Sequence, residues 1–174
     1  MQDHAKAMGC EVIGDIINDL DLSKRPFTAK GDSGTIYTAD AVILATGARA
    51  KWLGLPSEEK FKGFGVSACA TCDGFFYKGQ KVAAIGGGNT AIDAARSARR
   101  DGASVTLVYR RSEQEMPAVA DEVADAHREG VAFRFLAAPV SIERDGDRIR
   151  SVQVQAMQLG EPDASGRKRP EPVP

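Results

Sequence analysis

The amino-acid sequence predicts an α/β fold with a parallel sheet, and three observations support this. A short apolar strand over residues 81–85 is followed by a glycine turn, a helix with small apolar residues and a second strand over residues 104–109. This order is typical of a βαβ unit, whose crossover helix makes the two strands parallel. Earlier residues alternate short apolar runs with turn residues, which predicts an antiparallel β-meander. A stretch rich in Pro, Gly and charge separates the two patterns.

The chain is therefore expected to have three parts. Residues 1–48 form the small β-meander. Residues 49–66 form a connector, because they show no helical or strand periodicity. Residues 67–174 form a Rossmann-like domain built on the βαβ unit. The elements expected in the first part are a helix over residues 2–8 that ends at Gly9, a strand over 16–22 and an apolar strand over 41–44.

Beyond the βαβ unit, the Rossmann-like domain is expected to continue with one more helix and short strands. The helix covers residues 117–129, with Val119, Val123 and Ala126 facing inward. The last sixteen residues, 159–174, are rich in Pro, Gly and charge, so we expect an exposed loop or a frayed end. The further strands are expected at residues 131–135, 140–144 and 148–157, the last two flanking the turn sequence RDGD.

A glycine motif joins the first strand to the following helix. Gly86, Gly88 and Ala91 match G-x-G-x-x-A directly after the strand and directly before the helix. The first glycine permits a tight turn, the second lets the backbone approach a diphosphate, and the small third residue lets the helix pack on the strand. The same spacing in residues 63–68 follows no strand, so we reject it. The motif predicts a dinucleotide site, whose expected residues are Gly86, Gly87, Gly88, Asn89, Thr90 and Ala91, with Asn89 or Thr90 capping the helix.

Two arginines follow the second strand. Sites for NAD usually place an acid there to hold the ribose hydroxyls, but this strand ends in Arg110 and Arg111. Guanidinium groups suit the 2′-phosphate of NADP, so the pair favours NADPH as the cofactor. The alternative interpretation is a solvated basic pair at a strand end.

The three cysteines fall into one close pair and one single residue. Cys69 and Cys72 are three positions apart, a spacing that suits reversible disulfide chemistry. A structural zinc site is the competing interpretation, but it needs about four ligands. Only Cys10, His4 and His127 remain as further candidates, so no metal site is predicted. Cys10 stands where a strand is expected to begin and is predicted to be buried.

The overall composition excludes several classes of partner. The 23 basic and 24 acidic residues give a net charge of −1, which provides no general attraction to nucleic acid. No apolar run approaches the about 20 residues of a membrane span, and the first residues lack the apolar core of a signal peptide. These observations predict a cytoplasmic protein that binds neither nucleic acid nor membrane.

The first part of the chain, to about residue 100, resembles bacterial thioredoxin reductase. The resemblance is carried by SACATCDGFFYKGQKVAAIGGGNTA and by ILATGARAKWLGLPSEEKFKGFGV before it. It implies an NADPH-dependent flavoprotein disulfide reductase, in which electrons pass from NADPH through FAD to a Cys-x-x-Cys disulfide and then to a thioredoxin-like partner. Such families are commonly dimeric, so a homodimer is one expected arrangement.

The same resemblance implies roles for individual residues. Cys69 and Cys72 would be the redox pair, and Asp73 would be the nearby acid that handles a proton. Thr46 and Gly47 would lie where the FAD domain meets the flavin, which makes the β-meander a partial FAD-binding domain.

The second half is similar to the small subunit of glutamate synthase, starting with the run SEQEMPAVADEVADAHREG after Arg111. That family also uses NADPH and FAD, and it implies an alternative function as an electron-transfer protein. A third alternative is a non-catalytic NADP-binding fragment. Neither the first glycine motif of an FAD domain nor the last part of an NADPH domain is found, so we expect an incomplete FAD site and an incomplete C-terminus.

Overall fold

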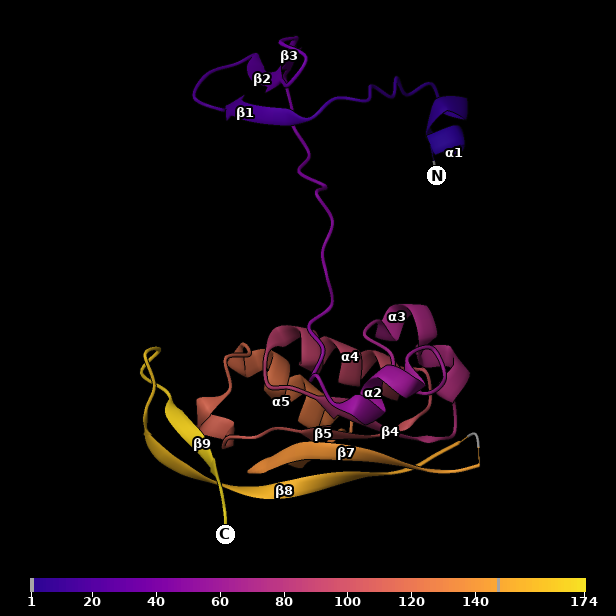
Figure 1. The fold of residues 1–174 in the computed structure, drawn as a ribbon, viewed down its shortest axis with the longest axis vertical. Coiled ribbons are helices and arrows are strands. Elements are labelled where there is room, and N and C mark those ends of the chain that lie inside the picture. The colour runs from indigo at the N-terminus through magenta and orange to yellow at the C-terminus, as the bar shows by residue number, and fades with distance from the viewer. Residues whose placement is uncertain (1, 147) are drawn as a thin grey trace. The chain divides into compact units, whose positions relative to one another are not determined.

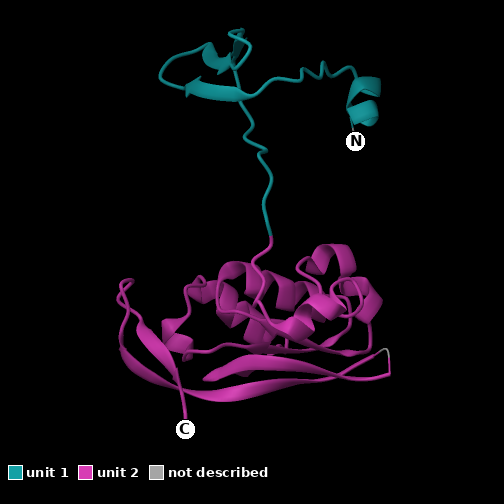
Figure 2. Cartoon of the chain, viewed as in Figure 1, with its two compact units in different colours: residues 1–49 teal, residues 50–174 magenta. Residues whose placement is uncertain are grey.

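The computed structural model describes residues 2–146 and 148–174, which divide into two units (Figure 2). Unit 1 comprises residues 1–49 and unit 2 comprises residues 50–174.

Unit 1 contains the expected antiparallel meander. Its three strands pair in the order β1-β2-β3, and a short helix precedes them (Figure 1). Asp15 fastens the sheet, because its Oδ2 accepts hydrogen bonds from the Ser33 hydroxyl at 2.6 Å and the Tyr37 hydroxyl at 2.7 Å. These bonds, with that of Ser33 the strongest, lower the pKa of Asp15 to about 2. The elements are α1 (Gln2–Ala7), β1 (Ile17–Asp21), β2 (Phe27–Gly31) and β3 (Ile36–Ala39).

Two expectations for unit 1 are wrong. Residues 41–44 form no strand, and the side chain of Ile43 is 90% exposed. An apolar run becomes a strand only when a neighbouring strand satisfies its backbone groups, and the sheet of unit 1 ends with β1 and β3 at its edges. Cys10 is exposed, because the residues around it also lie outside the strands.

Unit 2 is built on the predicted βαβ unit. A parallel sheet has the strand order β4-β5-β6, with Val82 opposite Val105 and Leu107 opposite Phe133. Helix α4 ends at Arg100, and Gly102 follows with a positive φ of 97°, as expected for a residue that terminates a helix. The elements are β4 (Lys81–Ile85), α4 (Asn89–Arg100), β5 (Ser104–Val108), the 3₁₀ turn η2 (Glu113–Glu115), α5 (Ala120–Arg128) and β6 (Ala132–Arg134).

The core of unit 2 lies between the parallel sheet and its helices. Ile92 of α4 and Leu107 of β5 are fully buried, and Val123 and Ala126 of α5 pack against them as predicted. Val119 was expected to face inward but is 54% exposed, because α5 begins only at Ala120. Figure 1 shows α4 and α5 on one side of β4 and β5, with β7 and β8 on the other.

A charged cluster joins α4 to α5. Arg96 of α4 pairs with Glu122, Asp125 and Glu129, and Arg100 also pairs with Glu129 at 2.5 Å. Hydrogen bonds from Arg100 and then Arg96 lower the pKa of Glu129 to about 2. The ion pairs of this cluster therefore link α4 to α5 along their polar sides.

The C-terminal residues form an antiparallel sheet, which corrects the prediction of a loop or frayed end. Strands pair in the order β7-β8-β9, and Asp163 N donates to Arg167 O at 2.7 Å across the second turn. Pro170 and Pro172 lie in β9, an edge strand, where a missing N–H is tolerated. The strands are β7 (Ala137–Asp145), β8 (Arg148–Pro162) and β9 (Lys168–Pro172).

The stretch interpreted as a connector contains a short helix, α2 (Pro56–Phe61). Glu58 is only 5% exposed and accepts hydrogen bonds from the amides of Leu53 and Gly54, at 3.1 and 2.9 Å. The Ser57 hydroxyl accepts a bond from the Ile142 amide of β7. The helix therefore packs against β7 within unit 2, and Glu58 binds the residues that precede the helix.

Candidate dinucleotide and disulfide site

The glycine loop between β4 and α4 has the geometry that the motif requires. Gly86 has a positive φ of 139°, and its amide donates to Val108 O at 3.0 Å, which ties the turn to β5. A Cβ on Gly86 would lie 2.9 Å from the Cβ of Ala91. The loop thus needs glycine at position 86 and a small residue at 91, because the helix passes close to the turn.

Gly87 and Gly88 have different surroundings. A Cβ on Gly87 would overlap the ring of Tyr109, so this glycine is covered by an aromatic side chain. Gly88 has ordinary extended backbone angles, and a Cβ there would meet only Pro117 Cγ at 3.9 Å. Gly88 is also the residue that caps α4. The backbone at the start of α4 is therefore open, and it fits a diphosphate held by helix amides.

The expected capping role of Asn89 or Thr90 is wrong. Helix α4 begins at Asn89 after the N-cap Gly88, and no side chain caps it. The Asn89 side chain instead accepts a hydrogen bond from the Val119 amide at 2.9 Å, and the Ala118 amide donates to Gly87 O at 3.2 Å. These two hydrogen bonds hold the segment before α5 against the glycine loop, and the Asn89 side chain is occupied by one of them.

The two arginines after β5 have different environments. Arg110 is exposed, but Arg111 is only 5% exposed. The Nε of Arg111 donates to Lys168 O at 2.7 Å, and its Nη2 lies 2.5 Å from Asp163 Oδ2. Arg110 is therefore the guanidinium at this edge that faces solvent, whereas Arg111 holds the β8–β9 hairpin.

The close cysteine pair forms a disulfide between Cys69 and Cys72, with Cα atoms 5.3 Å apart. Cys69 is the N-cap residue of the short helix α3 (Ala70–Asp73) and Cys72 lies within that helix, while the Cys69 amide donates to the Ser67 hydroxyl at 3.0 Å. Asp73 directly follows Cys72 and is half-buried.

Helix α3 and the following 3₁₀ turn η1 (Gly74–Tyr77) pack on the C-terminal end of α4 (Figure 1). A Cβ on the buried Gly74 would lie 2.9 Å from Asp101 Oδ2 and 3.9 Å from Ala98 Cα. The glycine loop lies at the other end of α4. Because α4 has 12 residues, it is about 18 Å long.

Thr46 and Gly47 lie in unit 1, in an exposed stretch without regular secondary structure. Gly47 has a positive φ of 81°. The predicted flavin contact of these two residues stays a prediction.

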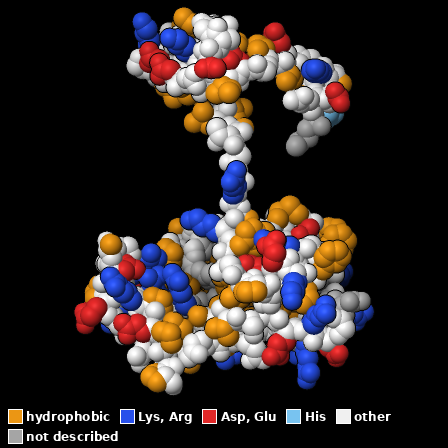
Figure 3. All heavy atoms as spheres, in the orientation of Figure 1, with side chains coloured by type: hydrophobic (Ala, Val, Ile, Leu, Met, Phe, Trp, Pro, Cys, Tyr) orange, Lys and Arg blue, Asp and Glu red, His pale blue; other side chains and the backbone are white. Residues whose placement is uncertain are grey.

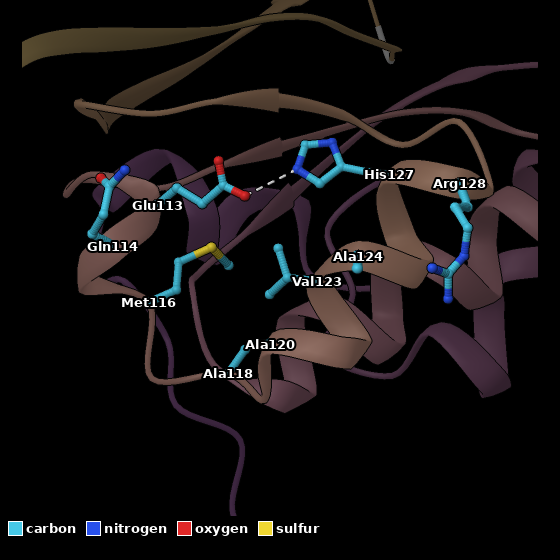
Figure 4. A pocket seen from close by; sticks show the side chains of 9 residues that line it. All are labelled: Glu113, Gln114, Met116, Ala118, Ala120, Val123, Ala124, His127 and Arg128. Atoms are coloured by element: carbon cyan, nitrogen blue, oxygen red, sulfur yellow. Dashed lines mark hydrogen bonds and ion pairs between the residues drawn. The ribbon is translucent and has the colours of Figure 1, made fainter.

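A hollow near the glycine loop was not expected from the sequence. It has a volume of about 540 Å³ and lies between η2 and α5 (Figure 4). His127 lines it, and its Nε2 lies 3.3 Å from Glu113 Oε1 while its ring stacks on Phe133 at 4.0 Å. Met116 and Val123 supply apolar walls. The residues that line this hollow come from η2 and α5, which are separate in the sequence, so no local sequence pattern could have predicted it.

Two structural findings concern metals and membranes. Within residues 2–146 and 148–174, no group of three or more His, Cys, Asp or Glu side chains could hold a metal ion. None of the helices in these ranges is long and apolar enough to cross a membrane.

Several known proteins are similar to this chain. The chain is 59% identical over 111 residues to a thioredoxin reductase of Escherichia coli O157:H7. The aligned residues make up 64% of this chain and 34% of that protein. A thioredoxin reductase of Coxiella burnetii is 56% identical over 111 residues, which again make up 64% of this chain and 34% of that protein. The structure of a thioredoxin reductase from Giardia duodenalis matches 97% of this chain and 53% of its own, with a TM-score of 0.66 and 30% identity.

The chain thus spans about a third of the length of the curated relatives that it matches. Residues 9–165 match the profile of the pyridine nucleotide-disulphide oxidoreductases. Because this match covers most of the chain, the chain belongs to the pyridine nucleotide-disulphide oxidoreductase family.

Proposed function

We propose that this chain acts in an NADPH-dependent flavoprotein disulfide reductase of the thioredoxin reductase type. Electrons pass from NADPH through FAD to the Cys69–Cys72 disulfide and then to a thioredoxin-like acceptor. The observation that carries the proposal is the presence of a glycine loop and a Cys-x-x-Cys disulfide at the two ends of one helix, α4.

The glycine loop is the proposed dinucleotide site. Gly88 leaves the start of α4 open to a diphosphate, and Gly86 and Ala91 allow the helix to pack close to the turn. Arg110 is exposed at the end of β5, where it would attract a 2′-phosphate. When bound, NADPH supplies a hydride and FAD relays its electrons. The glycine loop opens α4, and Gly74, two residues after Cys72, lies beside Ala98 and Asp101 near the other end of this helix of about 18 Å, an arrangement that supports a relay between the two features.

The disulfide is the proposed electron acceptor within the chain. Two electrons and two protons break the Sγ–Sγ bond and yield two thiols. The thiolate of one cysteine then attacks a disulfide of the acceptor, and the mixed disulfide is resolved by the other cysteine, which restores the Cys69–Cys72 bond and leaves the acceptor reduced. Asp73, the residue after Cys72, is proposed to hold the proton that the leaving sulfur takes up.

Thiol titration of the full chain tests the proposal. Free FAD is added, the chain is mixed with NADPH under argon, and thiols are counted with a chromogenic disulfide reagent. Cys10 is exposed and outside the disulfide, so the Cys10→Ser variant removes its background. In that variant we expect two new thiols per chain, and none in the matched Cys10→Ser, Cys69→Ser, Cys72→Ser variant.

Other results would contradict the proposal. Reduction of the flavin without new thiols would favour the glutamate synthase-like alternative, in which electrons leave through a partner. Binding of NADPH with neither change would favour a nucleotide-binding module without turnover.

A further inference from the structure

The β8–β9 hairpin is docked beside the end of β5. Arg111 is buried, and it bonds both the Asp163 carboxylate and the Lys168 carbonyl oxygen, at 2.5 and 2.7 Å. Glu115 of η2 accepts a hydrogen bond from the Lys168 amide at 3.0 Å. Both backbone groups of Lys168 are therefore held by the segment that follows β5.

This docking brings three consecutive basic residues, 167–169, to the edge that carries Arg110. Asp163 forms an ion pair with Arg111, whereas Glu115 accepts a hydrogen bond from the Lys168 amide and keeps its negative charge. Figure 3 shows Lys and Arg side chains, with Asp and Glu side chains beside them, over the part of unit 2 that contains the hairpin. The edge therefore carries four cations besides the ion-paired Arg111, namely Arg110, Arg167, Lys168 and Arg169.

The same edge borders the glycine loop. The Gly86 amide donates to Val108 O at the end of β5, and the next residue, Tyr109, covers Gly87. A dinucleotide whose diphosphate lies at Gly88 directs its adenosine ribose toward the end of the second strand. A 2′-phosphate on that ribose would meet the cations of this edge.

We propose that the β8–β9 hairpin forms part of the dinucleotide site, and that Arg167 and Lys168 join Arg110 in selecting a nucleotide with a 2′-phosphate. The inference rests on the proposed nucleotide function and deepens it. Arg111 is a positioning residue, because its Nε and Nη2 are committed to the hairpin. The hairpin thus supplies charge that neither strand β5 nor the glycine loop carries.

Calorimetry on the full chain separates the 2′-phosphate from the rest of the nucleotide. Adenosine 2′,5′-bisphosphate and adenosine 5′-diphosphate are the probes, and their affinity ratio is the readout. Each of Arg167→Gln and Lys168→Gln should lower the ratio about threefold, and the double variant about tenfold, as expected for charge-assisted contacts to phosphate. Arg150→Gln is the matched control, because Arg150 is an exposed cation of β8 near the opposite turn.

Three outcomes are informative. An unchanged ratio in the double variant overturns the inference and leaves the nucleotide function intact. An equal fall in Arg150→Gln also overturns it, because the effect would then come from overall charge. Absence of a preference in the wild-type chain overturns both the selection of NADPH and the inference.

Discussion

The three glycines of the loop have three separate physical roles. Gly86 adopts a backbone angle that other residues avoid, Gly87 makes room for Tyr109, and Gly88 leaves the helix start uncovered. Substitutions at the three positions should therefore affect folding stability and nucleotide binding differently.

A pair of alanine substitutions separates folding from binding. Gly88→Ala should change the free energy of unfolding by less than about 0.5 kcal/mol, because its Cβ meets only Pro117 at 3.9 Å, but should weaken nucleotide binding by about tenfold or more. Gly87→Ala should lower stability by about 1–3 kcal/mol, because its Cβ overlaps the Tyr109 ring. Urea unfolding and calorimetry measure the two effects. Equal losses of stability in the two variants would contradict this assignment.

A buried core residue and an exposed neighbour give a second comparison. Leu107 is fully buried, so Leu107→Ala should lower the free energy of unfolding by about 2–5 kcal/mol. Val119 is 54% exposed, and Val119→Ala should change the free energy of unfolding by less than about 0.5 kcal/mol. Trp52, the single tryptophan, lies in unit 2 and reports unfolding by its fluorescence. A small effect of Leu107→Ala would show that β5 is not in the core.

At the scale of the elements, α4 and α5 are joined by ion pairs as well as by apolar packing. The carboxylate of Glu129 receives bonds from Arg96 and Arg100, and its pKa falls from 4.5 to about 2. A carboxylate with a lowered pKa in the folded state contributes stability that is present above its unfolded pKa and is lost as the pH falls through the folded value.

This linkage predicts a pH dependence for unit 2. Thermal unfolding followed by Trp52 fluorescence should show a falling Tm as the pH drops from about 5 toward 2. Glu129→Gln should have a lower Tm at pH 7 and a shallower fall in that range. Asp15→Asn is the matched control, because Asp15 also has a pKa of about 2 but lies in unit 1. An unchanged slope in Glu129→Gln would refute the linkage.

The elements also indicate how far the sequence could predict the structure. Strands β4 and β5 and helix α4 follow from local apolar periodicity, and the glycine loop follows from its position between them. Strand β9 was missed because Pro, Gly and charge in its sequence resemble a loop, and only its pairing with β8 makes it a strand. The partners of Arg111 lie 52 and 57 positions away, beyond any local pattern.

At the scale of the whole molecule, the glycine loop, the disulfide and the hairpin all belong to unit 2, whereas Thr46 and Gly47 belong to unit 1. Every contact that shapes the glycine loop comes from residues 82–119. Nucleotide binding should therefore depend on unit 2 alone.

A fragment of residues 50–174 tests this division. It should unfold cooperatively and bind adenosine 2′,5′-bisphosphate with an affinity within about threefold of the full chain, a difference of less than about 1 kcal/mol. Calorimetry with both proteins gives the comparison. A folded fragment without binding would mean that unit 1 contributes to the site.

A crystal structure of the full chain grown with NADP⁺ would test the central claim most directly, because it locates the nucleotide. We predict density for the diphosphate at the amides that open α4, beside Gly88, and for the 2′-phosphate between Arg110 and the β8–β9 hairpin. A nucleotide bound elsewhere on unit 2, with the start of α4 covered by side chains, would contradict the account.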